Sequence, residues 1–164
     1  MIVFLTEQDT YQIAWAAVDR CQFKRNAGIV NTKRIDQKRD DYQIIREGLT
    51  GEWAVSQVLG VPVNIKNYLG GDPGCDFEYQ GYKIDVKTTR AKLLVFDSPD
   101  KFVADIAILA RYHQEDLVDL VGVISKKKFL ENCQVRNLGY GDKYVIQENH
   151  LTQIEEFKNH VNAR

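Results

Sequence analysis

The chain has 164 residues, and 22 Lys and Arg against 23 Asp and Glu give it a net charge of −1 at pH 7. A chain of this length buries a core as one domain without disulfides or a structural metal, and so balanced a charge by itself argues against a protein that coats nucleic acid. We expect neither a signal peptide nor a membrane span, because no basic region precedes the first apolar run and no run approaches about 18 apolar residues. The three cysteines are far apart and odd in number, which favours a reducing cytoplasm over a disulfide framework or a zinc site.

The first half of the chain carries two helical patterns. Residues 7–26 have apolar side chains at helical spacing, and Thr6 is suited to cap the start of this helix. Residues 35–59 carry a second apolar stripe, for which we expect a break near Gly48 and an end at Gly60.

The second half alternates predicted strands with short helices. Strands are expected at 62–68, 76–80, 82–88, 103–111 and 119–125, and helices at 126–132 and 151–161. Gln80-Gly81 is a plausible tight turn between the second and third of these strands. The pattern predicts a single α/β domain with a central mixed β-sheet flanked by helices. It spans 1–164, with N-terminal helices in 7–59, a catalytic core in 46–132 and a C-terminal helix in 151–161.

Basic residues gather in two places. One is the stretch 24–46, which contains Lys24, Arg25, Lys33, Arg34, Lys38, Arg39 and Arg46 against Asp36, Asp40 and Asp41. The other surrounds the predicted hairpin, with Lys83, Lys87, Arg90 and Lys92. A single run of this kind is most often a solvated face, but two runs that flank one acidic site favour a phosphate-bearing ligand.

The predicted hairpin also carries acids where strands usually have apolar or β-branched side chains. Alternate side chains of a strand share a face, so Asp85 and Lys87 point one way while Ile84 and Val86 point the other. Asp76 opens the partner strand, and antiparallel pairing brings it toward Asp85. Two converging carboxylates suit a hard divalent cation such as Mg²⁺. Such an ion fits phosphodiester hydrolysis, because acid–base catalysis by one side chain supplies only about 10²–10⁴-fold.

A third carboxylate is expected from the helix at 35–59. Gly48 lies one turn before Glu52 and Ser56 one turn after it, so small residues let this face approach the sheet. Glu52 is therefore the predicted third member of the site. Glu47 shares less of the apolar stripe, and we expect it to face water.

The order of these residues resembles the PD-(D/E)xK, or restriction-endonuclease-like, nuclease superfamily. A helical Glu52, Asp76 at the start of a strand and Asp85-Val86-Lys87 on the next strand carry the resemblance, which is strongest over 46–90. It implies Mg²⁺-dependent hydrolysis of DNA, with Mn²⁺ able to substitute, by a small stand-alone enzyme of phage or bacterial type. By this resemblance Asp76, Asp85, the Val86 carbonyl and Glu52 bind metal, and Lys87 orients or activates the attacking water.

The chain departs from the pattern of the superfamily at its proline. Pro73 is separated from Asp76 by two residues, which leaves Asp72 as a rival for the metal-binding position. We prefer Asp76, because the strand begins there and Asp72 more naturally starts the Pro-Gly turn.

Lys83, Arg90 and Lys92 are the predicted DNA contacts, so DNA is the expected partner, a membrane is not, and a homodimer stays open. The absence of a target-recognition domain favours a structure-specific or weakly sequence-specific enzyme. Endonuclease and exonuclease are not distinguished. Two other functions remain open: a catalytically inactive nucleic-acid-binding or assembly protein on the same fold, and a metal-dependent hydrolase of small phosphoesters.

Overall fold

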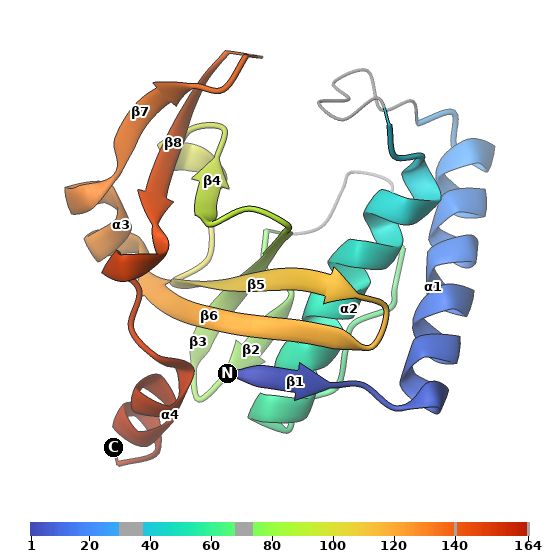
Figure 1. The fold of residues 1–164 in the computed structure, drawn as a ribbon, viewed down its shortest axis with the longest axis horizontal. Helices are drawn as coiled ribbons and strands as arrows, with labels where there is room; N and C mark the ends of the chain where they lie inside the picture. Colours follow the sequence, from blue (N-terminus) through green and yellow to red (C-terminus); the bar gives the residue numbers. More distant parts are fainter. Residues whose placement is uncertain (30–37, 68–73, 140, 164) are drawn as a thin grey trace.

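Two β-sheets and four α-helices make up the described part of the chain, residues 1–29, 38–67, 74–139 and 141–163 of a computed structural model (Figure 1). The helices are α1 (Glu7–Asn26), α2 (Asp41–Leu59), α3 (Lys126–Asn132) and α4 (Ile154–Asn162), with 3₁₀ turns at Pro99–Lys101 and Glu148–His150. The strands are β1 (Ile2–Phe4), β2 (Phe77–Tyr79), β3 (Tyr82–Thr89), β4 (Leu93–Phe96), β5 (Ile106–Gln114), β6 (Leu117–Ser125), β7 (Gln134–Asn137) and β8 (Asp142–Gln147).

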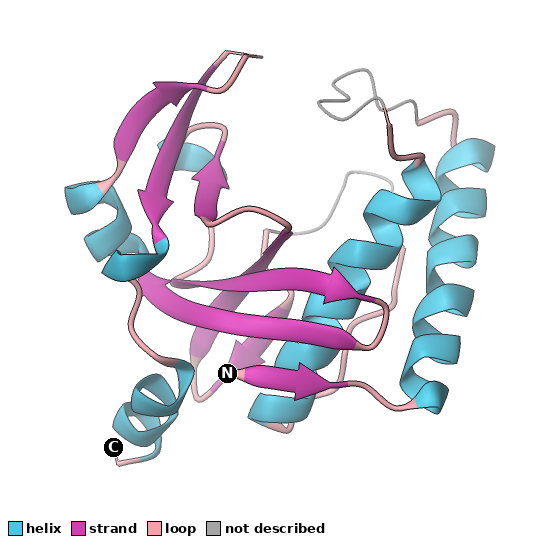
Figure 2. Ribbon diagram, in the orientation of Figure 1, coloured by secondary structure: helices cyan, strands magenta, loops and turns pink. Residues whose placement is uncertain are grey.

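The larger sheet has five strands in the order β1-β6-β5-β3-β2. Only β3 and β5 run parallel in it, and the other three strand pairs are antiparallel. The prediction of an α/β domain with a central mixed sheet and flanking helices is therefore confirmed (Figure 2). A second, antiparallel sheet in the order β4-β8-β7 was not predicted from the sequence pattern.

The two long helices begin at side-chain caps. Thr6 accepts a hydrogen bond from the Asp9 backbone and caps α1, as predicted, while Asp40 caps α2 in the same way. Helix α2 therefore starts at Asp41 rather than at 35, although 35–37 lie outside the described residues, and it runs through Gly48 without a break. Gly60 ends it in a left-handed conformation with φ of 70°, where glycine is favoured.

The predicted hairpin is present as β2 and β3. Its turn residues Gln80 and Gly81 have φ of 49° and 80°, the positive values that a two-residue turn of this kind requires. The strand predicted at 62–68 is wrong over 62–67, and 68 lies outside the described residues. Pro62 has no backbone N–H to donate, and the segment instead packs Val61 and Val63 against the core.

Two apolar cores lie on opposite faces of the larger sheet. Helices α1, α2 and α4 cover one face, where Ile84 and Val86 of β3 are buried. The smaller sheet and α3 cover the other face, where Ala107 and Leu109 of β5 are buried. Because Asp85 is paired with Ala107 and Lys87 with Leu109, both charged side chains belong to the face that looks toward the smaller sheet.

Candidate active site

Asp85 and Lys87 form an ion pair on the face of β3 that looks toward the smaller sheet. The Lys87 ammonium nitrogen lies 2.7 Å from Oδ1 and 2.7 Å from Oδ2 of Asp85. The Asp85 side chain is only 9% exposed and that of Lys87 39% exposed. Lys87 also lies 5.2 Å from the centre of the Phe96 ring of β4, within the range of a cation–π contact. The buried carboxylate is thus compensated by a partner that water reaches.

Asp76 lies at the entry to β2, beside the same part of β3. Its backbone N–H donates to the Ile84 carbonyl at 2.8 Å, and its Oδ2 accepts the Val86 N–H at 2.6 Å. Standard bond lengths place this oxygen within roughly 5 Å of the Asp85 Cα. The hairpin therefore brings Asp76 next to the Asp85–Val86 peptide, as the antiparallel pattern predicts. The rival Asp72 lies outside the described residues.

Helix α2 turns Glu47, and not Glu52, toward β3. Glu47 is 6% exposed, so the prediction that it faces water is wrong. Glu52 points to α1, where its Oε1 lies 3.9 Å from the Arg20 guanidinium. The prediction that Glu52 reaches the aspartates is therefore wrong.

Gly51 explains which face of α2 meets the sheet. A Cβ atom at Gly51 would overlap Thr88 Oγ1 and lie 3.1 Å from the Ala110 Cβ, so only glycine permits this approach. Glu47 precedes Gly51 by one helical turn and shares its face. The sequence signal that would have found this orientation is Gly51 itself, which lies one turn from Glu47 and next to Glu52.

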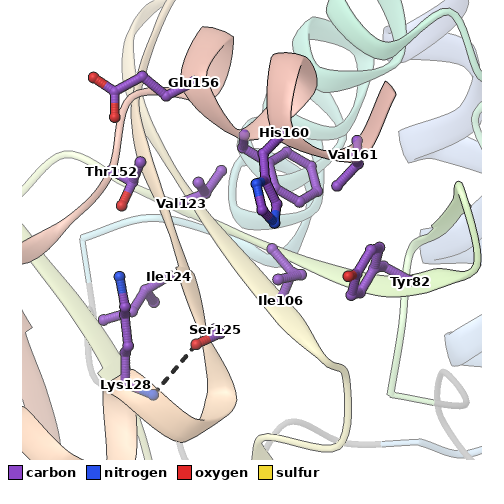
Figure 3. A pocket seen from close by; sticks show the side chains of 11 residues that line it. Tyr82, Ile106, Val123, Ile124, Ser125, Lys128, Thr152, Glu156, His160 and Val161 are labelled. Atoms are coloured by element: carbon purple, nitrogen blue, oxygen red, sulfur yellow. Dashed lines mark hydrogen bonds between the residues drawn. The ribbon is translucent and has the colours of Figure 1, made fainter. Parts of the chain in front are cut away.

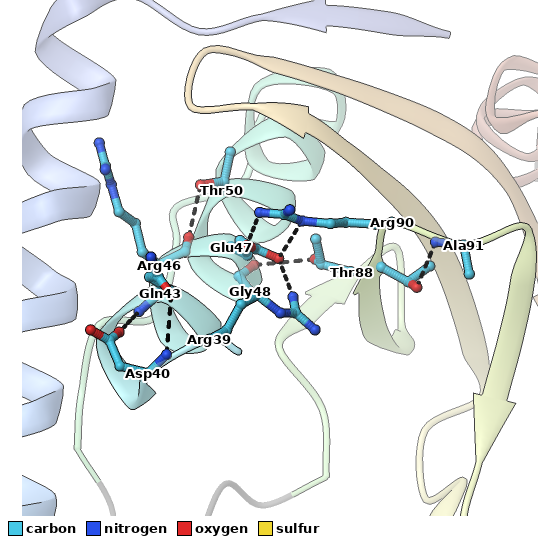
Figure 4. Close-up of polar contacts among 11 residues, drawn as sticks. Arg39, Asp40, Gln43, Arg46, Glu47, Gly48, Thr50, Thr88, Arg90 and Ala91 are labelled. Atoms are coloured by element: carbon cyan, nitrogen blue, oxygen red, sulfur yellow. Dashed lines mark hydrogen bonds and ion pairs between the residues drawn. The ribbon is translucent and has the colours of Figure 1, made fainter. Parts of the chain in front are cut away.

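Glu47 is held by two arginines from different segments (Figure 4). Its Oε2 accepts from Arg39 Nη1 at 2.5 Å, and its Oε1 accepts from Arg90 Nη2 at 2.5 Å. Arg90 Nε also donates to Glu47 Oε2, at 3.4 Å. The Arg90 guanidinium lies 5.3 Å from the centre of the Tyr112 ring. Burial and then the charge of Glu47 raise the pKa of Tyr112 above its ordinary value. Arg90, a predicted DNA contact, is thus anchored at the end of β3.

The other predicted DNA contacts are more loosely held. Lys92 is largely exposed, with Nζ 3.9 Å from Glu148. Lys83 is exposed on β3, and its backbone N–H donates to Asp105. In the basic stretch 24–46, Arg46 pairs with Glu115, while Lys33 and Arg34 lie outside the described residues.

Two carboxylates form the acidic part of the site. In the ranges that the structure describes, no group of three His, Cys, Asp or Glu side chains is placed to hold a metal ion. Mg²⁺ is usually bound through one or two carboxylates, with waters and substrate phosphates as the remaining ligands. Asp76 and Asp85 are therefore oxygen donors of the kind and number that Mg²⁺ takes, without Glu52.

A pocket of about 490 Å³ lies elsewhere, between α4 and the larger sheet (Figure 3). Apolar side chains such as Ile106 and Phe157 line it together with Lys128 and His160. A second pocket of about 600 Å³, between α1 and α2, is lined by Trp15 and Trp53 among others. Asp76, Asp85 and Lys87 line neither pocket, so neither is the enclosed site that a hydrolase of small phosphoesters would have at these residues.

Scans against family models, curated proteins and solved structures find no match to this chain. In the parts of the chain that the structure describes, no helix is long and apolar enough to cross a membrane.

Proposed function

We propose that the protein is a metal-dependent deoxyribonuclease that hydrolyses phosphodiester bonds in DNA and works in the cytoplasm. One observation carries the proposal: the Asp76 carboxylate lies beside the Asp85–Val86 peptide, and Asp85 is paired with Lys87 on the same strand. An acid at the entry to one strand and Asp-x-Lys on its hairpin partner also carry the resemblance to the PD-(D/E)xK superfamily.

Asp76 and Asp85 would hold the divalent cation, with the Val86 carbonyl as a further oxygen donor. When bound, Mg²⁺ would activate water and neutralise charge on the attacking and leaving oxygens. Lys87 is tethered by Asp85 and lies against Phe96, so its ammonium stays at the site. There it would orient the attacking water and stabilise negative charge on the phosphate.

A second function is favoured by a specific observation. The Lys87 ammonium already compensates the Asp85 charge, and the described residues supply no third acid to this site. This arrangement also suits a catalytically inactive protein that binds nucleic acid through Arg90 and its neighbouring basic residues.

Cleavage of supercoiled plasmid separates the two functions. The purified protein is incubated with plasmid in Mg²⁺, Mn²⁺, Ca²⁺ or EDTA, and nicked and linear products are quantified. Asp85→Asn and Asp76→Asn remove one charge each from the site. Glu78→Gln is the matched control, because Glu78 is an exposed acid on the short strand that Asp76 precedes.

The nuclease proposal predicts cleavage in Mg²⁺ and Mn²⁺ that falls to the EDTA background in both aspartate variants and is unchanged in Glu78→Gln. Cleavage that persists in Asp85→Asn would refute the assignment of the site. DNA binding without cleavage in either cation would favour the inactive binding protein.

A further inference from the structure

Helix α1 has apolar side chains on two opposite faces. One face is buried against the core and contains Ile13, Ala16 and Ala17. On the opposite face Tyr11 is 73% exposed, Trp15 is 59% exposed and Val18 is 44% exposed. A helix at the surface of a globular protein normally turns charged and polar side chains to water. Helix α1 therefore has a second apolar face that the core of one chain does not bury.

The exposed apolar residues form a stripe along α1. Tyr11, Trp15 and Val18 follow one another at intervals of four and three residues, which is the spacing at the seam between two packed helices. Helix α1 lies at the outer side of the molecule, with α2 on its inner side (Figure 1). The stripe borders the pocket of about 600 Å³ between these helices, where Ile65 is a further exposed apolar residue. Contiguous exposed apolar side chains mark a surface that another molecule covers.

Opposite charges lie at the two ends of the stripe. Glu7 is in the first turn of α1 and Arg25 in the last turn, and both side chains are exposed. They are 18 positions apart, which is about five turns at 3.6 residues per turn, so they lie on the same side of the helix. Their midpoint along the helix is Ala16, the residue that follows Trp15.

We propose that α1 packs antiparallel against α1 of a second copy of this chain, around a two-fold axis close to Ala16. In this dimer Glu7 of each copy lies opposite Arg25 of the other copy, and the Trp15 and Val18 side chains of both copies meet near the axis. A parallel pair would instead bring Glu7 beside Glu7 and Arg25 beside Arg25, and like charges repel. Charge complementarity therefore favours the antiparallel pair.

The choice of a second copy follows from the symmetry of the stripe. A two-fold dimer uses the same surface on both subunits, so that surface must be its own complement. The stripe meets this condition, because its apolar centre and its two oppositely charged ends match an inverted copy of itself. The inference does not depend on the proposed nuclease function, since Asp76, Asp85 and Lys87 lie outside α1.

The size of the interface predicts a weak dimer. Helix α1 has 20 residues and is about 30 Å long at 1.5 Å per residue. One pair of such helices is a small interface, so we expect a dissociation constant in the micromolar range. Sedimentation equilibrium of the whole chain, from micromolar to millimolar concentration, measures this constant.

Replacement of Trp15 tests the apolar centre of the interface. Trp15→Gln should raise the dissociation constant at least about tenfold, because central aromatic side chains carry much of the binding free energy of an interface. Leu130→Gln is the matched control, since Leu130 is an exposed apolar residue of helix α3, and it should leave the constant unchanged. Circular dichroism checks that each variant is folded.

Charge reversal tests the antiparallel orientation. Glu7→Arg and Arg25→Glu should each weaken the homodimer, because like charges then face each other at both ends. An equimolar mixture of these two variants should form a heterodimer, in which opposite charges face each other again. The chain that carries both changes should dimerise as wild type does. Glu131→Arg, at an exposed residue of α3, is the matched control for charge.

The outcomes decide the proposal. A wild-type dimer that Trp15→Gln weakens, together with a heterodimer of the two charge variants, supports it. A wild-type protein that stays monomeric at millimolar concentration overturns it, as does a dimer that Trp15→Gln leaves intact or a mixture that forms no heterodimer. A monomer that binds DNA less tightly after Trp15→Gln would assign the stripe to DNA and overturn the dimer. Plasmid cleavage is measured separately, so the nuclease function does not depend on this result.

Discussion

Gly51→Ala and Gly48→Ala should change stability in opposite directions, although both lie in helix α2. Replacing glycine by alanine inside a helix stabilises by about 0.5–1 kcal/mol, since alanine loses less backbone entropy on folding. A Cβ at Gly48 meets nothing within 4 Å, so this gain is unopposed there. At Gly51 the new methyl overlaps Thr88 Oγ1 and lies 3.1 Å from the Ala110 Cβ.

Overpacking of a close contact costs about 1–3 kcal/mol. Thr88 can rotate its hydroxyl away only by losing the hydrogen bond to the Gly48 carbonyl, which is 3.3 Å long. Ala110 is in the buried β5 strand and has no rotamer to change. Because the gain in helix propensity is common to both variants, their free energies of unfolding should differ by about 1–3 kcal/mol.

Urea denaturation followed by circular dichroism measures this difference, provided that the two variants keep the same m-value. Thr88→Ala in the Gly51→Ala background should recover part of the loss, because it removes the oxygen that the methyl overlaps. If Gly51→Ala proves as stable as Gly48→Ala, then α2 does not approach β3 through Gly51, and the orientation of Glu47 has no support.

Three further outcomes follow from the same contacts. Glu47→Gln should lower the free energy of unfolding in urea by about 1–2 kcal/mol, because it weakens charged hydrogen bonds. Glu52→Gln should lower it by less than about 1 kcal/mol, because Glu52 lies 3.9 Å from its partner Arg20. Tyr112 has a raised pKa in the folded state. Its contribution to stability is therefore complete below the unfolded pKa of about 10 and is lost as the pH rises past that value. Tyr112→Phe should reduce this loss of stability at alkaline pH, measured in thermal melts. Phe102→Ala should lower the free energy of unfolding in urea by about 3–5 kcal/mol, because Phe102 is fully buried and its ring centre lies 4.4 Å from that of Phe96. A loss of less than about 1 kcal/mol would contradict this packing.

The sequence could predict the parts of the site that depend on local pattern. Alternation along β3 placed Asp85 and Lys87 on one face, and Gln80-Gly81 placed the turn that brings Asp76 alongside. The face of α2 was not predictable in the same way, since it depends on the contact of Gly51 with another element. Helical spacing alone does not say which of two small residues touches the sheet.

The smaller sheet was missed for a related reason. Strands β4 and β7 have four residues each, and every residue of β7 is exposed, so neither carries a long alternating pattern. The β8 residues that pair with β4 lie 48 to 54 positions from their partners in the chain. Such pairing is determined by packing of Leu94, Phe96 and Ile146 over the larger sheet rather than by local propensity.

The proposed nuclease function depends most on a divalent cation shared by Asp76 and Asp85. Titration with Mn²⁺, followed by the electron paramagnetic resonance signal of the free ion, measures this directly in the wild-type protein and in Asp85→Asn, Lys87→Met and Glu78→Gln. We predict that wild type and Glu78→Gln bind Mn²⁺ equally and that Asp85→Asn loses the site. Lys87→Met should bind at least as tightly as wild type, because it removes the ammonium that lies 2.7 Å from the Asp85 oxygens. Equal Mn²⁺ binding by wild type and Asp85→Asn would contradict the account.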